Sequence, residues 1–571
     1  MTTYTELKSA ISRTPVTLMV LTLDFCGRIF GESPCNATGA PCYNTYPTCK
    51  YKSAYLRQSK DYKFTSSNSP LPFKTNERPY LDNIKYLPTE IKDNLTITGR
   101  VVAKLFDVPD TDIGIDPYWA QRSSIQGTFW KKLIARNPNY KGRLIKIYTG
   151  FLGITETEFQ KKWVGVVENI GLEKNSIRIE IIDLLKNLAE IEIPPKLDIK
   201  LVIEITETST ELTLTTVTGL DSPDGYIRLK DEIIYYNEVD TATNQLKGLT
   251  RGYFSTVATT HKAKDKIQKV RYYSPTNPFD LLKEILQADA GISTDYIDID
   301  AFNYWRDWPG GEANFSAIVS EPTKLNKLYF EIIDLIDCKS WIGEDLKITI
   351  RRNISNEPDR PYYVFTDEAN LIYGSTSVDL NEKSRLTRIL LYWDKTTLGK
   401  LDEIKEYNRL DMAIDADAES ANEYNETIEK KYFCRWLRTG YMQEELMTAF
   451  IKNTITRQLF RQRNAQPFIK FDVELKDSDI KSGSYCRLST DECLNIDGTM
   501  LLKEMFQVVR RDSVNNKINL KLLKLPTERF CFIAPNDTPG YDDATDIQKE
   551  YGFITDNNGL IDDKSIGYHI W

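Results

Sequence analysis

The pattern of hydrophobic and polar residues predicts β-strands through most of the first 200 residues. Residues 16–25 are almost continuously apolar and predict a buried first strand. A polar stretch with Pro and Ser follows at 59–93. Beyond it, several segments alternate apolar and polar positions between Gly, Asn or Asp residues, a spacing typical of a closed or nearly closed barrel. The alternating segments are LTITGRVVAKLFDV, RLIKIYTGFLG, KKWVGVVENIG and SIRIEIIDLLKNL.

Four further regions follow this β-rich unit of 1–200. Residues 201–275 alternate around a SPDGY turn and predict a small inserted β module. Residues 276–375 predict an α+β middle domain, in which Asn277 or Pro278 can start a helix and Gly291 can end it.

The remaining chain predicts a second β domain at 376–525 and a turn-rich C-terminal extension at 526–571. An amphipathic helix interrupts the second β domain, because large apolar residues recur there at helical spacing. These residues are Leu446, Met447, Phe450, Ile451, Ile455 and Leu459. The expected fold class is therefore mainly β with α+β.

Composition and charge narrow the class of protein. The 571 residues are 41% hydrophobic and 27% charged, the balance of a soluble protein with several domains. No run approaches the ~18 apolar residues that a membrane span needs, so we expect no stable membrane insertion. Thr17, Thr22 and Asp24 interrupt the first apolar segment, so a processed secretory peptide is not expected. A net charge of −8 argues against a nucleic-acid coat but leaves room for a channel through which DNA passes.

Four cysteines lie close together at the start of the chain, in DFCGRIFGESPCNATGAPCYNTYPTCKY. Their spacing is C-x8-C-x6-C-x6-C, and four thiolates can bind zinc or an iron–sulfur cluster. Zinc sites usually use C-x2-C pairs, which this segment lacks, so the wide gaps favour a cluster. Two disulfides or four free thiols are the alternatives. The four residues are Cys26, Cys35, Cys42 and Cys49.

The cysteine loop at 25–51 is rich in Gly, Pro and Asn, which favour turns. It has neither the ferredoxin spacing nor the spacing of radical enzymes, so a bound cluster is expected to stabilise structure and not to transfer electrons. The other cysteines are scattered and are expected in the core. They are Cys338, Cys434, Cys486, Cys493 and Cys531.

Other candidate residues favour structural roles. With only His261 and His569 available, histidine-based catalysis has little support, and His261 is expected to stabilise a turn. Four acidic residues predict a solvated face or, as the sharper alternative, a calcium site that lacks the glycine and terminal glutamate of an EF-hand. They are Asp411, Asp415, Asp417 and Glu419.

Basic and aromatic residues later in the chain are also expected to have structural roles. Three arginines at the end of the amphipathic helix are expected to snorkel or form ion pairs and not to bind DNA. They are Arg457, Arg461 and Arg463. The segment NYWRDWPGGEANF, with Trp305, Trp308 and Gly310, suits a core or an interface better than a sugar-binding platform. No P-loop, nucleophile elbow or H-E-x-x-H motif occurs, so we expect no enzyme.

Several segments resemble one family. The loop motif DFC…YNTYPTC, with Tyr43, Asn44 and Thr45, resembles the cysteine loop of tail-tip or baseplate hub proteins of long-tailed bacteriophages and gene transfer agents. That family includes relatives of the minor tail protein L of phage lambda. GLTRGYFSTVATTHKAKDKIQ resembles a β module that recurs in phage tail proteins, and NPFDLLKEILQADAGI the helix opening the hub's middle domain. YGFITDNNGLIDDKSIGYHIW resembles their closing segment.

The resemblance implies a trimeric ring at the distal end of a tail tube, between the tube and the fibre or tip. Two barrel-like hub domains per subunit, at about 1–200 and 376–525, would give the trimer a pseudo-sixfold face matching the tube. It also implies a [4Fe-4S] cluster, with zinc as the alternative. The implied ligands are Cys26, Cys35, Cys42 and Cys49.

The functional hypothesis is a virion structural protein that closes the DNA channel until ejection. Its expected partners are two further copies of itself, a distal tail or tube protein and a central tip or fibre protein, with phage DNA only in transit. Its expected location is the distal virion tail, assembled in the host cytoplasm. Two alternatives are a tail-associated cell-wall hydrolase, whose activity would lie in the middle domain, and a zinc-stapled adhesion protein.

Overall fold

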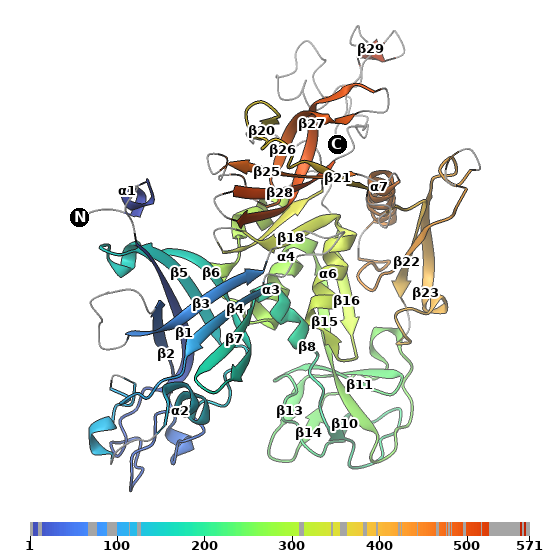
Figure 1. Cartoon of the computed structure of the whole chain (residues 1–571). Coiled ribbons are helices and arrows are strands. Elements are labelled where there is room, and N and C mark those ends of the chain that lie inside the picture. The colour runs from blue at the N-terminus through green and yellow to red at the C-terminus, as the bar shows by residue number, and fades with distance from the viewer. Residues whose placement is uncertain are drawn as a thin grey trace.

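Strands dominate this protein and gather around a central α+β region (Figure 1). The expected class, mainly β with α+β, is confirmed. No helix among the described residues is long and apolar enough to cross a membrane. The computed structural model describes residues 4–9, 14–66, 77–87, 100–113, 115–122, 127–307, 313–343, 346–353, 363–380, 385–395, 398–420, 423, 425–441, 443–463, 467–474, 477, 480, 482–494, 498–514, 517–524, 560–561 and 565–566.

The N-terminal strands form a closed barrel in the order β1-β2-β3-β4-β7-β6-β5, as the alternating pattern predicts. Only the β2–β3 pair is parallel in this barrel. Helix α2 contributes Phe129, Trp130 and Leu133 to the barrel core. The elements are β1 (Pro15–Cys26), β2 (Arg57–Ser66), β3 (Glu77–Leu87), β4 (Arg100–Phe106), α2 (Phe129–Arg136), β5 (Leu144–Phe151), β6 (Gln160–Leu172) and β7 (Ser176–Ile182).

Strand β1 explains the apolar run near the N-terminus. Met19 and Leu21 point into the barrel core. Leu18 and Val20, on the opposite face, pack in an outer cluster that includes Phe159. Because both faces are covered, the strand lacks the usual apolar–polar alternation. The apolar segment is therefore a buried strand.

Strands β2 and β3 lie within the polar stretch 59–93, where the sequence pattern did not predict strands. Tyr62 and Phe64 on β2 and Leu81 on β3 carry the apolar face, while most other positions are at least partly exposed. Three apolar side chains in polar surroundings are a weak signal, and only pairing with β1 and β4 makes these segments strands.

The inserted module contains two small sheets around its own core. Its longest strand, β15, pairs with β11 and β9 inside the module and with β16 of the middle domain further along. One continuous strand thus joins the module to the middle domain. The strands are β9 (Ile199–Lys200), β10 (Glu211–Thr213), β11 (Gly225–Leu229), β12 (Glu232–Tyr236), β13 (Glu238–Asp240), β14 (Gln245–Lys247), β15 (Lys266–Thr276) and β16 (Phe315–Val319).

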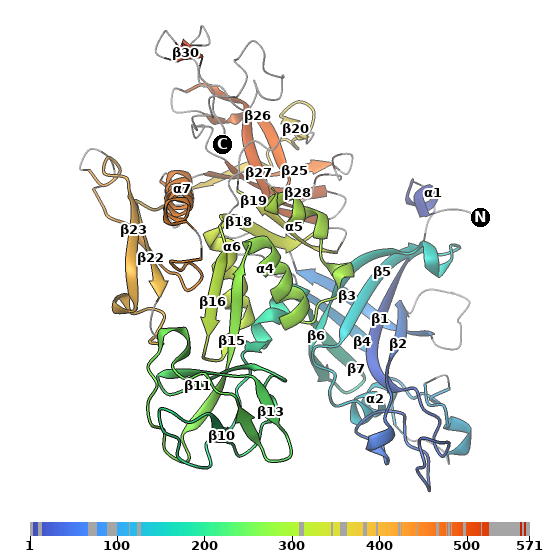
Figure 2. The same cartoon turned by 180° about the vertical axis from the view of Figure 1, so that it is seen from behind.

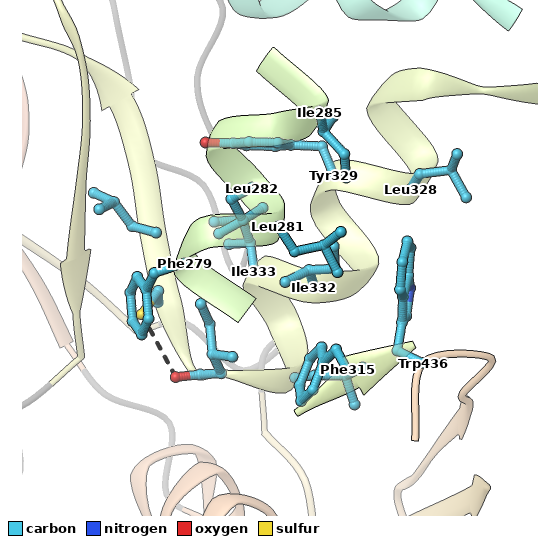
Figure 3. Close-up of a cluster of buried hydrophobic side chains, with 14 of the residues drawn as sticks. Phe279, Leu281, Leu282, Ile285, Phe315, Leu328, Tyr329, Ile332, Ile333 and Trp436 are labelled. Carbon is cyan, nitrogen blue, oxygen red and sulfur yellow. Dashed lines mark hydrogen bonds between the residues drawn. The ribbon is translucent and has the colours of Figure 1, made fainter. Parts of the chain in front are cut away.

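The middle domain holds the largest core, in which α4 and α6 pack against β16 (Figure 3). The side chain of Asn277 caps α4 by accepting from the Phe279 N–H at 3.0 Å, as the sequence predicts. The helical segment ends just before Gly291, whose φ of +66° suits glycine. The elements are α4 (Pro278–Glu284), α5 (Ile299–Arg306), α6 (Leu325–Leu335), β18 (Cys338–Ile342) and β19 (Ile348–Arg352).

The C-terminal β region differs from the second barrel that the sequence led us to expect. Its described strands form a six-stranded sheet, β20-β26-β27-β28-β25-β21, and a three-stranded sheet, β23-β22-β24, neither of which is closed. The larger sheet has a core of its own. Its strands are β20 (Tyr363–Thr366), β21 (Ser377–Leu380), β25 (Pro467–Glu474), β26 (Tyr485–Leu494), β27 (Met500–Val514) and β28 (Lys517–Lys524); the smaller has β22 (Arg388–Lys395), β23 (Tyr407–Ile414) and β24 (Glu429–Phe433).

The predicted amphipathic helix is α7 (Glu444–Gln462), and it packs on the middle-domain core. Arg461 pairs with Asp337 of the middle domain at 2.6 Å. Burial alone would raise the pKa of Asp337, but the charges of Arg461 and Arg457 lower it. The barrel and the β22–β24 sheet lie on opposite sides of the middle domain (Figures 1 and 2).

Candidate metal centre in the cysteine loop

The cysteine loop connects β1 to β2 at one end of the barrel. Cys26 is the last residue of β1, so the barrel itself positions the first thiol. The side chains of Cys26, Cys35 and Cys42 are buried, and Cys49 is half-buried. Cys26 thus lies at the end of a strand, and the other three residues predicted as ligands lie in the loop that follows it.

Asn44 organises the centre of the loop. Its backbone carbonyl accepts from the Cys26 N–H at 2.7 Å, and its side-chain amide donates to the carbonyls of Cys26 at 3.1 Å and Arg28 at 3.2 Å. The Cys42 thiol lies 3.6 Å from Asn44 Oδ1. Asn44 has a φ of +53°, a left-handed conformation that asparagine adopts more readily than most residues. One residue thus ties the first cysteine to the third.

Arg122 holds the same segment from outside the loop. It donates from Nη1 to the Pro41 carbonyl at 2.9 Å and from Nη2 to the Cys42 carbonyl at 2.7 Å, and its Nε pairs with Asp116. The Arg122 guanidinium lies 3.8 Å from the ring centre of Tyr43, and that of Arg136 lies 3.9 Å from the same centre. These contacts fasten the loop to α2 and to the 107–122 connection.

Burial and the other three thiols of the loop all influence the pKa of Cys42. Burial raises the pKa of the Cys42 thiol, the hydrogen bond from Asn44 opposes this, and Cys49, Cys35 and Cys26 raise it further. Burial alone would lower the pKa of Arg122, but Asp116, Tyr43 and Cys42 raise it above its usual range. A protonated Cys42 would have to release its proton to bind a metal.

The residue types suit an iron–sulfur cluster or zinc, because the loop contains four thiols and three of them are buried. Among the residues that the structure describes, no group of three or more His, Cys, Asp or Glu side chains is arranged to hold a metal ion. The structure thus shows that three of the four thiols are buried, and the binding of a cluster or of zinc stays a prediction.

Arg122, Arg136 and Asp116 were missed by the sequence analysis. They follow the last cysteine by more than 60 residues, and DPYWAQR contains no motif that points to a cysteine loop. Only the folding of the 107–122 connection and α2 against the barrel brings Arg122, with its partner Asp116, to the Cys42 carbonyl and Arg136 to the Tyr43 ring.

Substitution of Arg122 by methionine is expected to destabilise the loop by about 1–3 kcal/mol, because Asp116 and two loop carbonyls lose a charged donor. Hydrogen exchange of the amides at 41–49 measures the effect. The matched control is Arg57→Met, which removes an exposed pair with Asp24 and should change stability by less than about 0.5 kcal/mol. Equal protection in both variants would contradict the role of Arg122.

The inserted module contains the only histidine in the described residues. His261 is buried and places Nε2 2.8 Å from Glu232 Oε2. Its backbone also exchanges two hydrogen bonds with Ile205 at 3.0 Å. The expected structural role of His261 is confirmed, and His569 lies outside the described residues.

The acidic candidates are mostly paired within the fold, so the expected solvated face applies mainly to Asp417, which is exposed. Asp411 accepts from the Trp393 indole at 2.8 Å. Asp415 pairs with Arg463 at 2.8 Å, and Glu419 with Arg388 at 2.6 Å.

The remaining candidates behave as core residues where they are described. Trp305 is buried in the middle-domain core, as expected, and Trp308 and Gly310 lie outside the described residues. Of the scattered cysteines, Cys493 is half-buried and Cys531 lies outside the described part of the chain. The other three are buried: Cys338, Cys434 and Cys486.

No protein-family model and no curated protein matches this chain. Among solved structures, it is similar to the 43 kDa tail protein of prophage MuSo2 from Shewanella oneidensis (6% identity, 77% of this chain and 92% of that one, TM-score 0.34). It is similar to the tail protein of Neisseria meningitidis MC58 (9%, 77% and 91%, TM-score 0.36). It is also similar to a prophage tail protein of Listeria monocytogenes (9%, 78% and 90%, TM-score 0.33). TM-scores and identities this low establish neither a shared fold nor a shared function.

Proposed function

We propose that this protein is a structural hub of a phage-like tail, with a loop held in shape by a [4Fe-4S] cluster. The observation that carries the proposal is the loop of four cysteines, three of them buried, which joins two strands of a β-barrel and resembles the loop of tail-tip hub proteins. The ligands would be Cys26, Cys35, Cys42 and Cys49. A bound cluster would cross-link four loop positions that are otherwise held only by turns and by Arg122.

As a hub, the protein would form a three-fold ring at the distal end of the tail tube. The ring would join the tube or a distal tail protein to a central tip or fibre protein, and it would close the DNA channel until ejection. A net charge of −8 supports this arrangement, because an acidic wall repels phosphates and prevents DNA from sticking. The proposed role is assembly and not catalysis.

The test is cryo-EM of the full-length protein and of tails that contain it, with the protein purified without oxygen. We expect a ring of three copies at the tail tip and continuous density joining the four cysteines. A monomeric protein located elsewhere on the particle would contradict the hub. If metal analysis finds zinc and no iron, the site is a zinc site and the cluster hypothesis is wrong. If the full chain clears peptidoglycan, the protein is a hydrolase and the purely structural role is wrong.

A further inference from the structure

A pocket of about 890 Å³ lies where three parts of the chain meet. The inserted module contributes Ile233 and Phe254, and the middle domain contributes residues between 318 and 335. The β22–β24 sheet and its connections contribute residues at 395–402 and 431–438. This volume is in the range of ligand-binding pockets, and junctions between units are common places for them.

Apolar side chains and a buried ion pair form one wall. Phe330, Leu335 and Trp436 line the pocket, and Trp436 packs beside α6 of the middle domain (Figure 3). The Trp436 indole donates to Glu331 Oε2 at 3.0 Å, and Arg435 pairs with the same carboxylate at 3.0 Å. The wall is thus fixed before any ligand arrives.

The rim of the pocket is basic in a chain with an excess of acidic residues. Seven basic and four acidic side chains line it, whereas the whole chain has 74 basic and 82 acidic residues. Arg435 neutralises Glu331, and burial raises the pKa of Asp334 to about 6. Within the described part of the chain, no ion pair is formed by Lys327, Lys400 or Arg438. The pocket therefore attracts negative charge.

The module's side of the pocket has a strained backbone. Phe254 and Ser255 have φ values of +54° and +64°, which bulky residues rarely adopt. Thr256 holds the turn, because its hydroxyl donates to the Tyr253 carbonyl at 2.8 Å and accepts from the Ile233 N–H at 3.0 Å. The turn sets Phe254 against Tyr272, with ring centres 4.7 Å apart, at the edge of the pocket. Strain maintained in this way is common at binding sites.

We propose that this pocket binds an acidic segment of a partner polypeptide. An apolar side chain of the partner would pack against Trp436 and Phe330, and carboxylates beside it would meet Lys327 and Lys400. The apolar wall favours a peptide over a nucleic acid, because Phe330 and Trp436 can bury an apolar side chain, which a phosphate backbone lacks. The inference goes beyond the hub function and does not depend on a metal in the cysteine loop.

The test is selection of a random 12-residue peptide library on the immobilised full-length chain, followed by fluorescence anisotropy of the selected peptides. We expect enrichment of Asp and Glu around one large apolar residue. The variant K327E/K400E should weaken binding at least tenfold, and higher salt should weaken it further. The matched control is K162E/K174E, which makes the same charge change at exposed barrel positions and should bind as the unmodified chain does.

Three results would overturn the proposal. The first is selection of neutral or basic peptides, or of none, on the unmodified chain. The second is equal affinity in K327E/K400E and K162E/K174E. The third is a change in oligomeric state caused by K327E/K400E alone, which would assign the pocket to a second copy of this chain.

Discussion

Replacement of Cys42 by serine is expected to remove most of the bound iron and to unfold the loop between β1 and β2. Serine keeps the size of the side chain but is a poor ligand for iron. Cys42 is also the cysteine tied most closely to its surroundings, through Asn44 and Arg122. For structural metal sites the binding energy is on the order of 10 kcal/mol, and it is folding energy when the site does not exist in the unfolded chain.

The effect of Cys42→Ser is measured as iron per chain, as absorbance near ~400 nm and as hydrogen exchange at 27–56. Cys493→Ser is the matched control, since Cys493 is half-buried in β26, far along the chain from the loop, and should leave all three readouts unchanged. If the loop has the same protection in Cys42→Ser as in the unmodified protein, no metal stabilises it. Iron loss in the Cys493 variant would show that the assignment of the ligands is wrong.

Replacement of Glu232 by alanine is expected to destabilise the inserted module by about 3–5 kcal/mol. The Glu232 side chain is 1% exposed, and its carboxylate accepts from Arg251 at 2.7 and 2.8 Å and lies 2.8 Å from His261. It also accepts from the backbone N–H groups of Gly252 at 3.0 Å and Thr259 at 3.1 Å. Removing the Glu232 carboxylate leaves the Arg251 guanidinium buried without its counter-charge. An uncompensated buried charge is the main cause of the destabilisation when a buried ion pair is broken.

The pH dependence of the Glu232 contribution follows from its pKa. Burial alone would raise this pKa, but Arg251, His261 and the two backbone donors lower it below the usual value. The carboxylate therefore stabilises the module above the ordinary glutamate pKa of about 4.3 and loses this contribution as the pH falls through the lower folded pKa. The difference between Glu232→Ala and the unmodified chain should shrink in acid.

Hydrogen exchange of β11 and β12 measures the Glu232 effect, because it reports opening of the module separately from the rest of the chain. Glu238→Ala is the matched control. The Glu238 side chain is 61% exposed, and its carboxylate lies 3.7 Å from Lys247 Nζ, a long distance for an ion pair. Glu238→Ala should change the free energy of opening of β11 and β12 by less than about 0.5 kcal/mol. Similar effects of the two variants would mean that the Glu232 network does not hold the module together.

Local sequence signals predicted the elements whose structure is determined by residues close to one another in the sequence. The apolar run at 16–25 predicted a buried strand, and Asn277 predicted the start of a helix. The same reasoning did not find β2 and β3, whose few apolar residues become a buried face only when β1 and β4 lie beside them. The second barrel was implied only by the resemblance, and the described strands there form sheets with edges; alternation reports a strand and not how a sheet closes.

For the cysteine loop, the sequence by itself determined the donor set: four thiols at regular spacing, in turn-forming residues directly after a strand. Ligand chemistry belongs to the side chains, so the type of site follows from residue identity. The tertiary structure alone decided which groups hold the loop, because Arg122, paired with Asp116, reaches the Cys42 carbonyl and Arg136 reaches the Tyr43 ring through contacts between distant segments. It likewise decided the basic pocket, whose lining residues come from segments up to 200 residues apart. Such convergence depends on packing energy summed over the whole core, which no local pattern contains.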